Sequence, residues 1–181
     1  MHRLRNTRNS KKNTISMENR TTAWSAVDFY RRLTEKNKLA QSKHFAFVRT
    51  SGLKGVEEAV AKMQSTPNFI MVADNAAGYT ELDPTPHIRQ MNTVFIAMRH
   101  KLGDMDARQR CLDTIKEINR QFCSKLLMEK TLLMENAQYL DPRINLQEAP
   151  SALIPGTAVC MFEVAVDTFV DMSYKPEEWD D

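Results

Sequence analysis

The sequence is poor in glycine and histidine. Of its 181 residues, five are glycine and four are histidine. The glycines do not form the G-x-x-x-x-G-K-[ST] pattern of a phosphate-binding loop, and the nearest candidate, Ser51–Gly55 (SGLKG), does not match it. The histidines are scattered along the chain, and none belongs to an H-E-x-x-H motif. The sequence therefore has no phosphate loop and no helical zinc-protease motif.

Cysteine is also scarce. Cys111, Cys123 and Cys160 lie among apolar neighbours without the paired spacing of a zinc site. Cys111 and Cys123 are twelve positions apart on one predicted helix, which places them about 18 Å apart and out of disulfide range. We expect buried free thiols in a protein of a reducing compartment.

Long apolar runs are missing, and the charge is unevenly distributed. No run of about 18 apolar residues could span a membrane, and no apolar segment near the N-terminus resembles a signal peptide. Residues 1–20 carry six basic groups and one acidic group, although the net charge of the chain is only +2. We expect a basic, disordered leader over residues 1–20 and a single domain over residues 21–181, located in the cytoplasm. Met17 is a candidate natural start.

The most informative segment that is present is Cys160–Tyr174, because its residues alternate between apolar and polar. One parity carries Phe162, Val164, Val166, Thr168, Val170 and Met172, and the other carries Glu163, Asp167, Asp171 and Ser173. This period of two predicts a long strand with one buried face and one acidic face exposed to solvent or to a channel. Acids four positions apart lie about 13 Å from each other on a strand, too far to share a metal ion. We therefore expect no metal, no cofactor and no catalytic acid pair.

The rest of the chain predicts alternating helices and strands. The expected order is a helix from Thr22 or Ser25 to Ala40, a strand at 44–49, a helix from Ser51, a strand at 68–73, an exposed loop at 74–90, a strand at 93–100, a helix at 105–130, an irregular segment at 139–155 with a short strand at 144–146, and the final strand. This pattern indicates an α+β fold with a mainly antiparallel sheet of four or five strands, packed by helices on one face.

The same order of elements resembles the small tail-terminator and tail-completion proteins of tailed bacteriophages over residues 24–179. The chain is also similar to prophage proteins of the Bacteroides type in its YTEL segment (Tyr79–Leu82), its TVFIAMRH segment (Thr93–His100) and its Tyr-x-Pro-x-Glu-Trp ending (Tyr174–Trp179). The resemblance implies a non-enzymatic subunit that forms a ring, commonly a hexamer, on the tail tube. Its partners would be further copies of itself and the tail-tube and neck proteins, with DNA passing through the ring.

On this interpretation, we expect six side chains to face a neighbouring subunit or the channel: Glu163, Asp167, Asp171, Tyr79, Glu81 and Arg89. In a ring, all copies of the three β-strand acids would lie at one radius and repel passing DNA. The protein would be assembled in the host cytoplasm, would become part of the virion and would have no membrane partner.

Two alternatives from other classes remain open. His100 and Asp104 could approach each other after the third strand and form a base with an orienting carboxylate, although Asp104 is better explained as a helix N-cap. Alternatively, the basic N-terminal arm could bind nucleic acid. A ring would favour the tail protein, and a monomer with a deep pocket would favour the enzyme.

Overall fold

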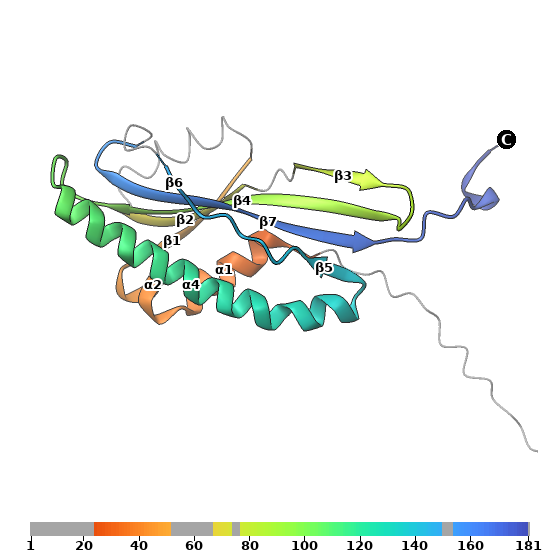
Figure 1. Ribbon diagram of the computed structural model, residues 1–181, viewed down its shortest axis with the longest axis horizontal. Helices are drawn as coiled ribbons and strands as arrows, with labels where there is room; N and C mark the ends of the chain where they lie inside the picture. Colours follow the sequence, from red (N-terminus) through yellow and green to blue (C-terminus); the bar gives the residue numbers. More distant parts are fainter. Residues whose placement is uncertain (1–23, 52–66, 74–76, 150–153, 181) are drawn as a thin grey trace, which may run out of the picture.

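The computed structural model describes residues 24–51, 67–73, 77–149 and 154–180. In these residues one β-sheet is covered on one face by a layer of helices (Figure 1). The predicted α+β fold, with helices on one face of the sheet, is confirmed. No helix in this part of the chain is both long and apolar enough to cross a membrane.

The described sheet has seven strands, more than the four or five expected. They are β1 (Ala46–Thr50), β2 (Asn68–Ala73), β3 (Ala77–Glu81), β4 (His87–Arg99), β5 (Gln138–Leu140), β6 (Gln147–Glu148) and β7 (Thr157–Phe169). Their order is β1-β2-β4-β7-β5, with β3 beside β4 and β6 beside β7. Strands β1 and β2 are parallel, and the other pairs are antiparallel. The sheet is therefore mixed but mainly antiparallel.

Three α-helices form the second layer of the described structure. They are α1 (Ala26–Lys36), α2 (Lys38–Ser42) and α4 (Met105–Glu135), and the C-terminal segment adds the short 3-10 helix η2 (Pro176–Glu178). The single helix expected up to Ala40 is divided at Asn37, which ends α1 and accepts a hydrogen bond from the Ala40 N–H to cap α2. The helix expected from Ser51 lies outside the described residues.

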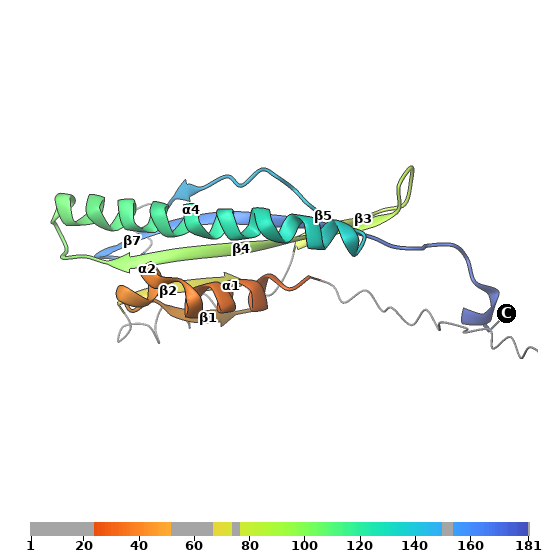
Figure 2. The same ribbon diagram turned by 90° about the horizontal axis from the view of Figure 1, so that it is seen from below.

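Helix α4 determines the length of the helix layer. Its N-cap is Asp104, as expected, and the Asp104 carboxylate accepts a hydrogen bond of 2.7 Å from the Ala107 N–H. The helix ends at Glu135, beyond the expected Lys130, and its 31 residues span about 46 Å. It crosses the sheet along most of its length (Figure 2).

The main core lies between the helices and the sheet. Tyr30 of α1 contacts Phe122 of α4 and Phe162 of β7, with ring centroids 5.8 and 5.9 Å apart. Val94, Ile96, Val164 and Ile115 of the surrounding elements are also buried in this core. One aromatic cluster thus joins both main helices to the centre of the sheet.

Strands β4 and β7 pair over thirteen residues each, from His87↔Phe169 to Arg99↔Thr157. The predicted alternation of β7 is confirmed where Phe162, Val164 and Val166 are buried and Glu163 is exposed. The expected bounds were wrong, because the strand begins at Thr157 and ends at Phe169.

The end of β7 has a clear physical cause. Phe169 pairs with His87, the first residue of β4, so no ladder partner exists beyond it. Val170 is consequently half-buried instead of buried, and Asp171 lies outside the strand.

The alternation predicted that the face of the sheet away from the helices would be exposed and acidic along its whole length. This prediction is only partly correct. Around Val159, this face carries a second apolar cluster that also includes Phe69, Met71, Ala97 and Ala149. The β7 side chains that face away from the helices are therefore apolar near the start of the strand, and acidic side chains occur only at later positions.

Two expectations for the connecting segments were wrong. The expected loop 74–90 contains β3 and the beginning of β4, because the prolines Pro84 and Pro86 fall in the turn between these strands. Gly78 lets the strands approach, since a Cβ atom there would lie 1.9 Å from the Arg89 carbonyl oxygen. The short strand expected at 144–146 is absent from the described residues, and β5 and β6 flank that position instead.

Substitutions at two positions of β7 test the facing of the strand. Val166→Asp should prevent folding or reduce the free energy of unfolding by several kcal/mol, because it places an unpaired charge in the core. The control Glu163→Gln, on the opposite face, should change that free energy by less than about 0.5 kcal/mol. Urea denaturation followed by circular dichroism measures both, and equal losses would contradict the observed facing.

Candidate functional site

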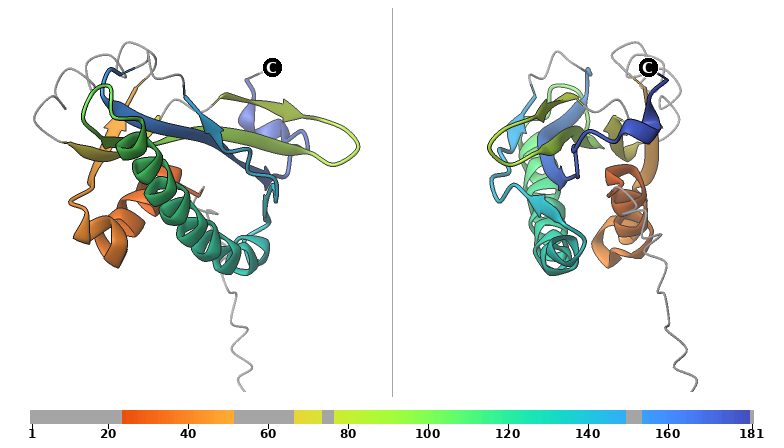
Figure 3. Two further views of the ribbon diagram at one scale, coloured as in Figure 1. Left: turned by 60° about the vertical axis from the view of Figure 1, so that its left-hand side comes forward. Right: turned by 90° about the vertical axis from the view of Figure 1, so that its right-hand side faces the viewer.

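Most of the residues expected at an interface lie on one end of the sheet. There, β3, the first residues of β4 and the last residues of β7 run side by side and extend past α1 (Figures 1 and 3). On the face away from the helices, this end carries Tyr79, His87, Arg89, Asp167 and Phe169. We call these five residues the sheet-end surface.

The sheet-end surface has an aromatic part. The ring of His87 lies between those of Tyr79 and Phe169, with centroid distances of 6.0 and 5.7 Å. The side chain of Tyr79 is 50% exposed, and that of Phe169 is 39% exposed. Three rings from three adjacent strands thus form a row that solvent still contacts.

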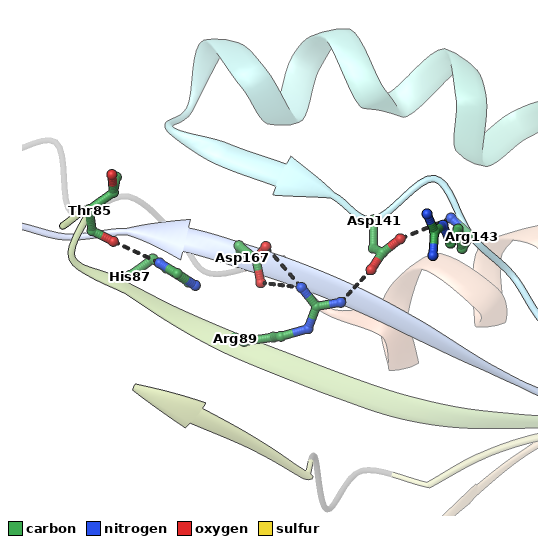
Figure 4. A network of polar contacts seen from close by, with 6 residues as sticks. All are labelled: Thr85, His87, Arg89, Asp141, Arg143 and Asp167. Carbon is green, nitrogen blue, oxygen red and sulfur yellow. Dashed lines mark hydrogen bonds and ion pairs between the residues drawn. The ribbon is translucent and has the colours of Figure 1, made fainter. Parts of the chain in front are cut away.

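Beside the aromatic row, Arg89 binds two carboxylates (Figure 4). Its Nη1 donates to both carboxylate oxygens of Asp167, at 3.2 and 3.1 Å, and its Nη2 donates to Asp141. Asp141 also accepts a 2.9 Å hydrogen bond from the backbone N–H of Arg143. The network connects β4, β7 and the segment after β5, and its formal charge is −1.

These contacts stabilise the charged forms of Arg89 and Asp141. The Arg143 N–H and the positive charge of Arg89 hold the pKa of the Asp141 carboxyl below its ordinary value of 3.8. Hydrogen bonding to Asp141, together with the charge of Asp167, raises the pKa of Arg89. Arg89 and Asp141 therefore keep their charges at neutral pH.

The network corrects the prediction for Asp167. We expected an exposed acid, but Asp167 is only 8% exposed and is paired with Arg89. The two residues are direct cross-strand neighbours, so the arginine covers and neutralises the carboxylate. Asp167 therefore does not contribute a free negative charge to this face.

The other five residues expected at an interface lie at different distances from the sheet-end surface. Tyr79 and Arg89 belong to the sheet-end surface, and Glu81 pairs with His87 at its border. Glu163 is exposed on the same face, opposite Thr93. Asp171 is exposed but lies beyond the strand, and its carboxylate accepts hydrogen bonds from Ser173.

Sequence reasoning missed His87, Phe169 and Asp141. Phe169 has the same parity as Asp167, so the alternation could have placed it on this face. The sequence predicts a loop at residues 74–90, so the position of His87 as the first residue of β4 was not expected. Asp141 reaches Arg89 across 52 positions of sequence, and no local pattern indicates that contact.

A hollow of about 360 Å³ adjoins the sheet-end surface. It lies on the side of β7 away from β4, where residues 162–165 separate the pairing with β6 from the pairing with β5. Its lining includes Thr93, Arg143, Asn145, Gln147 and Glu163, and it contains no histidine, cysteine or serine. These side chains can hydrogen-bond to a bound group, but the lining has no histidine that could act as a general base for the Thr93 hydroxyl.

The catalytic alternative gains no support from the geometry. The Asp104 carboxylate caps α4, and the Nδ1 atom of His100 lies 2.9 Å from the carbonyl oxygen of its neighbour Lys101. Within the described ranges, no group of three or more His, Cys, Asp or Glu side chains is placed to hold a metal ion. The basic N-terminal arm lies outside these ranges, so its role in nucleic-acid binding stays a prediction.

The cysteines are free, as expected, and two of them are buried. Cys111 and Cys160 are buried and Cys123 is half-buried. Burial raises the pKa of Cys160 to about 11, so its thiol is protonated at neutral pH. A protonated, buried thiol is a poor nucleophile, and Cys160 is best understood as part of the core.

Arg89→Met should destabilise the chain by about 1–3 kcal/mol, because it leaves two neighbouring carboxylates without their cation. The control Arg143→Met retains the backbone N–H that binds Asp141 and should cost less than about 0.5 kcal/mol. Urea denaturation at pH 7 compares the two variants. Equal losses would show that the Arg89 network does not contribute to stability.

The lowered pKa of Asp141 predicts a dependence of stability on pH. Its charged form contributes stability above the ordinary value of 3.8, and this contribution disappears as the pH falls through the lower pKa of the folded state. Asp141→Asn should therefore be less stable than the wild type at pH 6, and the difference should shrink below about pH 4. Denaturation curves from pH 6 to pH 3 measure it, and a constant difference would contradict the assignment.

Two comparisons with known proteins bear on the function. No family model matches this chain, and a search of curated proteins finds no relative. The function is therefore inferred from the surfaces and contacts of the chain itself.

Proposed function

We propose that this chain is a structural subunit that assembles head to tail into a closed ring, of the kind that caps the tail tube of a tailed phage. The observation that carries the proposal is a pair of different surfaces on opposite faces of the molecule, one with exposed aromatic rings beside an ion-pair network and one aliphatic. One is the sheet-end surface, and the other is the outer side of α4.

The outer side of α4 carries four exposed apolar side chains in its C-terminal half: Leu127, Met128, Leu132 and Met134. Each is more than half exposed, whereas Phe122, Leu126 and Leu133 of the same helix are buried toward the sheet. We call these four residues the α4 patch. Exposed apolar clusters of this kind are typical of surfaces that bind another protein.

The two surfaces face in opposite directions, because α4 covers one face of the sheet and the sheet-end surface belongs to the other (Figures 1 and 3). A contact between two different surfaces of identical subunits is heterologous, and it produces either a closed ring or an open filament. A two-fold dimer would need only one self-complementary surface. Two opposite surfaces thus favour the ring that the tail-terminator resemblance implies.

The chemistry of the sheet-end surface is suited to such a contact. Tyrosine and arginine are enriched at protein interfaces, and Arg89 is already neutralised by its carboxylate partners, which lowers the cost of burying it. Exposed Glu163 and half-buried Glu81 lie beside this surface and would border the channel or a neighbouring subunit. In the proposed assembly, the ring binds the tail-tube and neck proteins in the virion and lets DNA pass through its channel.

Mass measurement tests the proposal directly. Light scattering at increasing protein concentration should show an oligomer of fixed stoichiometry, and electron microscopy of the same sample should show closed rings. The experiment is repeated with assembled tail tubes from the same phage. A chain that remains monomeric and also fails to bind tubes would overturn the proposal.

Variants of the sheet end test which face makes the contact. Tyr79→Ser should weaken assembly by about tenfold or more, because it removes an exposed aromatic anchor. Ile88→Ser is the matched control, since Ile88 is 40% exposed on the adjacent strand β4 but belongs to the opposite face of the sheet. Equal effects of the two substitutions on the concentration of half-assembly would contradict this role of the sheet-end surface.

A further inference from the structure

The hollow beside β7 lies at a break in strand pairing. On the edge of β7 that faces away from β4, β6 pairs with residues 160–161 and β5 pairs with residues 166–168. The connecting segment 141–147 leaves the ladder between these two pairings and forms the wall of the hollow. The edge of β7 is therefore covered at both ends of the hollow and open between them.

The backbone of Glu163 faces this opening. Along an antiparallel strand, the N–H and C=O groups of successive residues point to alternate edges. Ala165 directs its groups to the edge shared with β5, because its carbonyl oxygen accepts a 3.0 Å hydrogen bond from the Asp141 N–H. Glu163 has the same parity as Ala165, and no backbone hydrogen bond joins it to the described segment 141–147. Its N–H and C=O are thus placed to pair with an added extended chain.

The wall of the hollow is held in place from behind. Ile144 and Leu146 pack against the main core on the helix side of the sheet. The side chains that alternate with them, Arg143, Asn145 and Gln147, line the hollow instead. The wall is thus preformed, which lowers the entropy cost of binding a ligand.

The lining of the hollow carries one positive and one negative side chain without a partner. Arg143 on the wall and Glu163 on the floor form no ion pair or side-chain hydrogen bond with any other described residue. The remaining charged side chains of the lining, Arg89 and Asp141, bind each other (Figure 4). The lining therefore favours a ligand that has both a carboxylate and an ammonium group over one with a single charge.

The size of the hollow restricts the ligand to a short one. Its volume of about 360 Å³ is near the lower end of the range for small-molecule sites. The open stretch of β7, residues 162–165, is about 13 Å long, and β5 and β6 occupy the same edge beyond it. A long added strand could not continue in either direction. Met91, Met161 and Ala165 form the apolar part of the lining and suit small apolar side chains.

From these features we infer that the hollow binds a short peptide with two free ends, about two or three residues long. The peptide backbone pairs with the N–H and C=O of Glu163, and the side-chain amides of Asn145 and Gln147 bind its other polar groups. Its terminal carboxylate binds the Arg143 guanidinium, and its ammonium group binds the Glu163 carboxylate. This ligand site goes beyond the proposed structural role and does not depend on assembly.

Trialanine with free ends is the probe, and trialanine with an acetylated N-terminus and an amidated C-terminus is its control. Isothermal titration calorimetry of the full chain should show saturable binding of the free peptide at millimolar concentration. The capped peptide should bind at least about tenfold more weakly, because capping removes both charged contacts.

NMR spectra of the full chain with isotope-labelled methionine methyl groups locate the binding. The signals of Met91 and Met161 should shift as the free peptide is added, since both side chains line the hollow. The signals of Met105 and Met128, which are exposed on α4, should stay unchanged.

Two variants test the charged contacts. Arg143→Met should lower the affinity for the free peptide at least about tenfold and should no longer distinguish a free from an amidated C-terminus. Glu163→Gln should lower the affinity to a similar extent. Both variants are expected to fold with nearly wild-type stability, so weaker binding reports the contact itself. Arg32→Met is the matched control, since Arg32 is exposed on α1, and it should bind like the wild type.

Three outcomes would overturn the inference. The first is the absence of saturable binding, or binding that leaves Met91 and Met161 unshifted. The second is equal affinity for the free and capped peptides, which would show that the charged ends are not recognised. The third is an unchanged affinity of Arg143→Met. None of these results bears on ring formation, and a chain that binds the peptide but forms no ring and ignores tail tubes would refute the proposed function alone.

Discussion

The thirteen-residue pairing of β4 with β7 is the constraint on which the rest of the structure depends. It places Val94, Ile96 and the even-numbered residues of β7 against the helices, and it sends the odd-numbered residues to the other face. A shift of one residue in this register would exchange the two faces completely. The core between Tyr30, Phe122 and Phe162 forms only in the observed register, and this core in turn fixes the helices.

The face of the sheet away from the described helices differs in character along its length. Near Val159 it carries a second apolar cluster, whereas near Asp167 it carries a row of aromatic rings and a compensated group of charges. Arg89 binds Asp141 and Asp167 together, so a basic side chain and two acidic ones can lie at the same end of the sheet with little net charge. This arrangement leaves the aromatic rings, and not a field of negative charge, as the main feature of the sheet end.

The two sides of the subunit differ in a way that suits directional assembly. The α4 patch is aliphatic, while the sheet end carries aromatic rings and the Arg89 network. In the proposed assembly, these two different surfaces would pair with each other, so association between copies would have a direction. A ring would be the closed form of such association.

The sequence by itself determined the elements whose signals are local. The alternation around Val164 predicted the central strand, the apolar spacing from Met105 predicted the long helix, and Asp104 and Ser25 identified helix starts, because each pattern repeats with the period of its own element. The family resemblance placed Tyr79 and Arg89 among the interface residues, and the strand pattern supplied Asp167.

Only the tertiary structure decided how these elements meet. Residues 77–81, in a segment that its prolines led us to predict as a loop, form strand β3 because they pair with β4. Gly78 permits the close approach of the two strands. Asp167 is buried because the register sets Arg89 opposite it, and Asp141 joins them from a distant segment. Pairing between strands is a non-local interaction, and a sequence states what each strand can bury but not which neighbour will cover it.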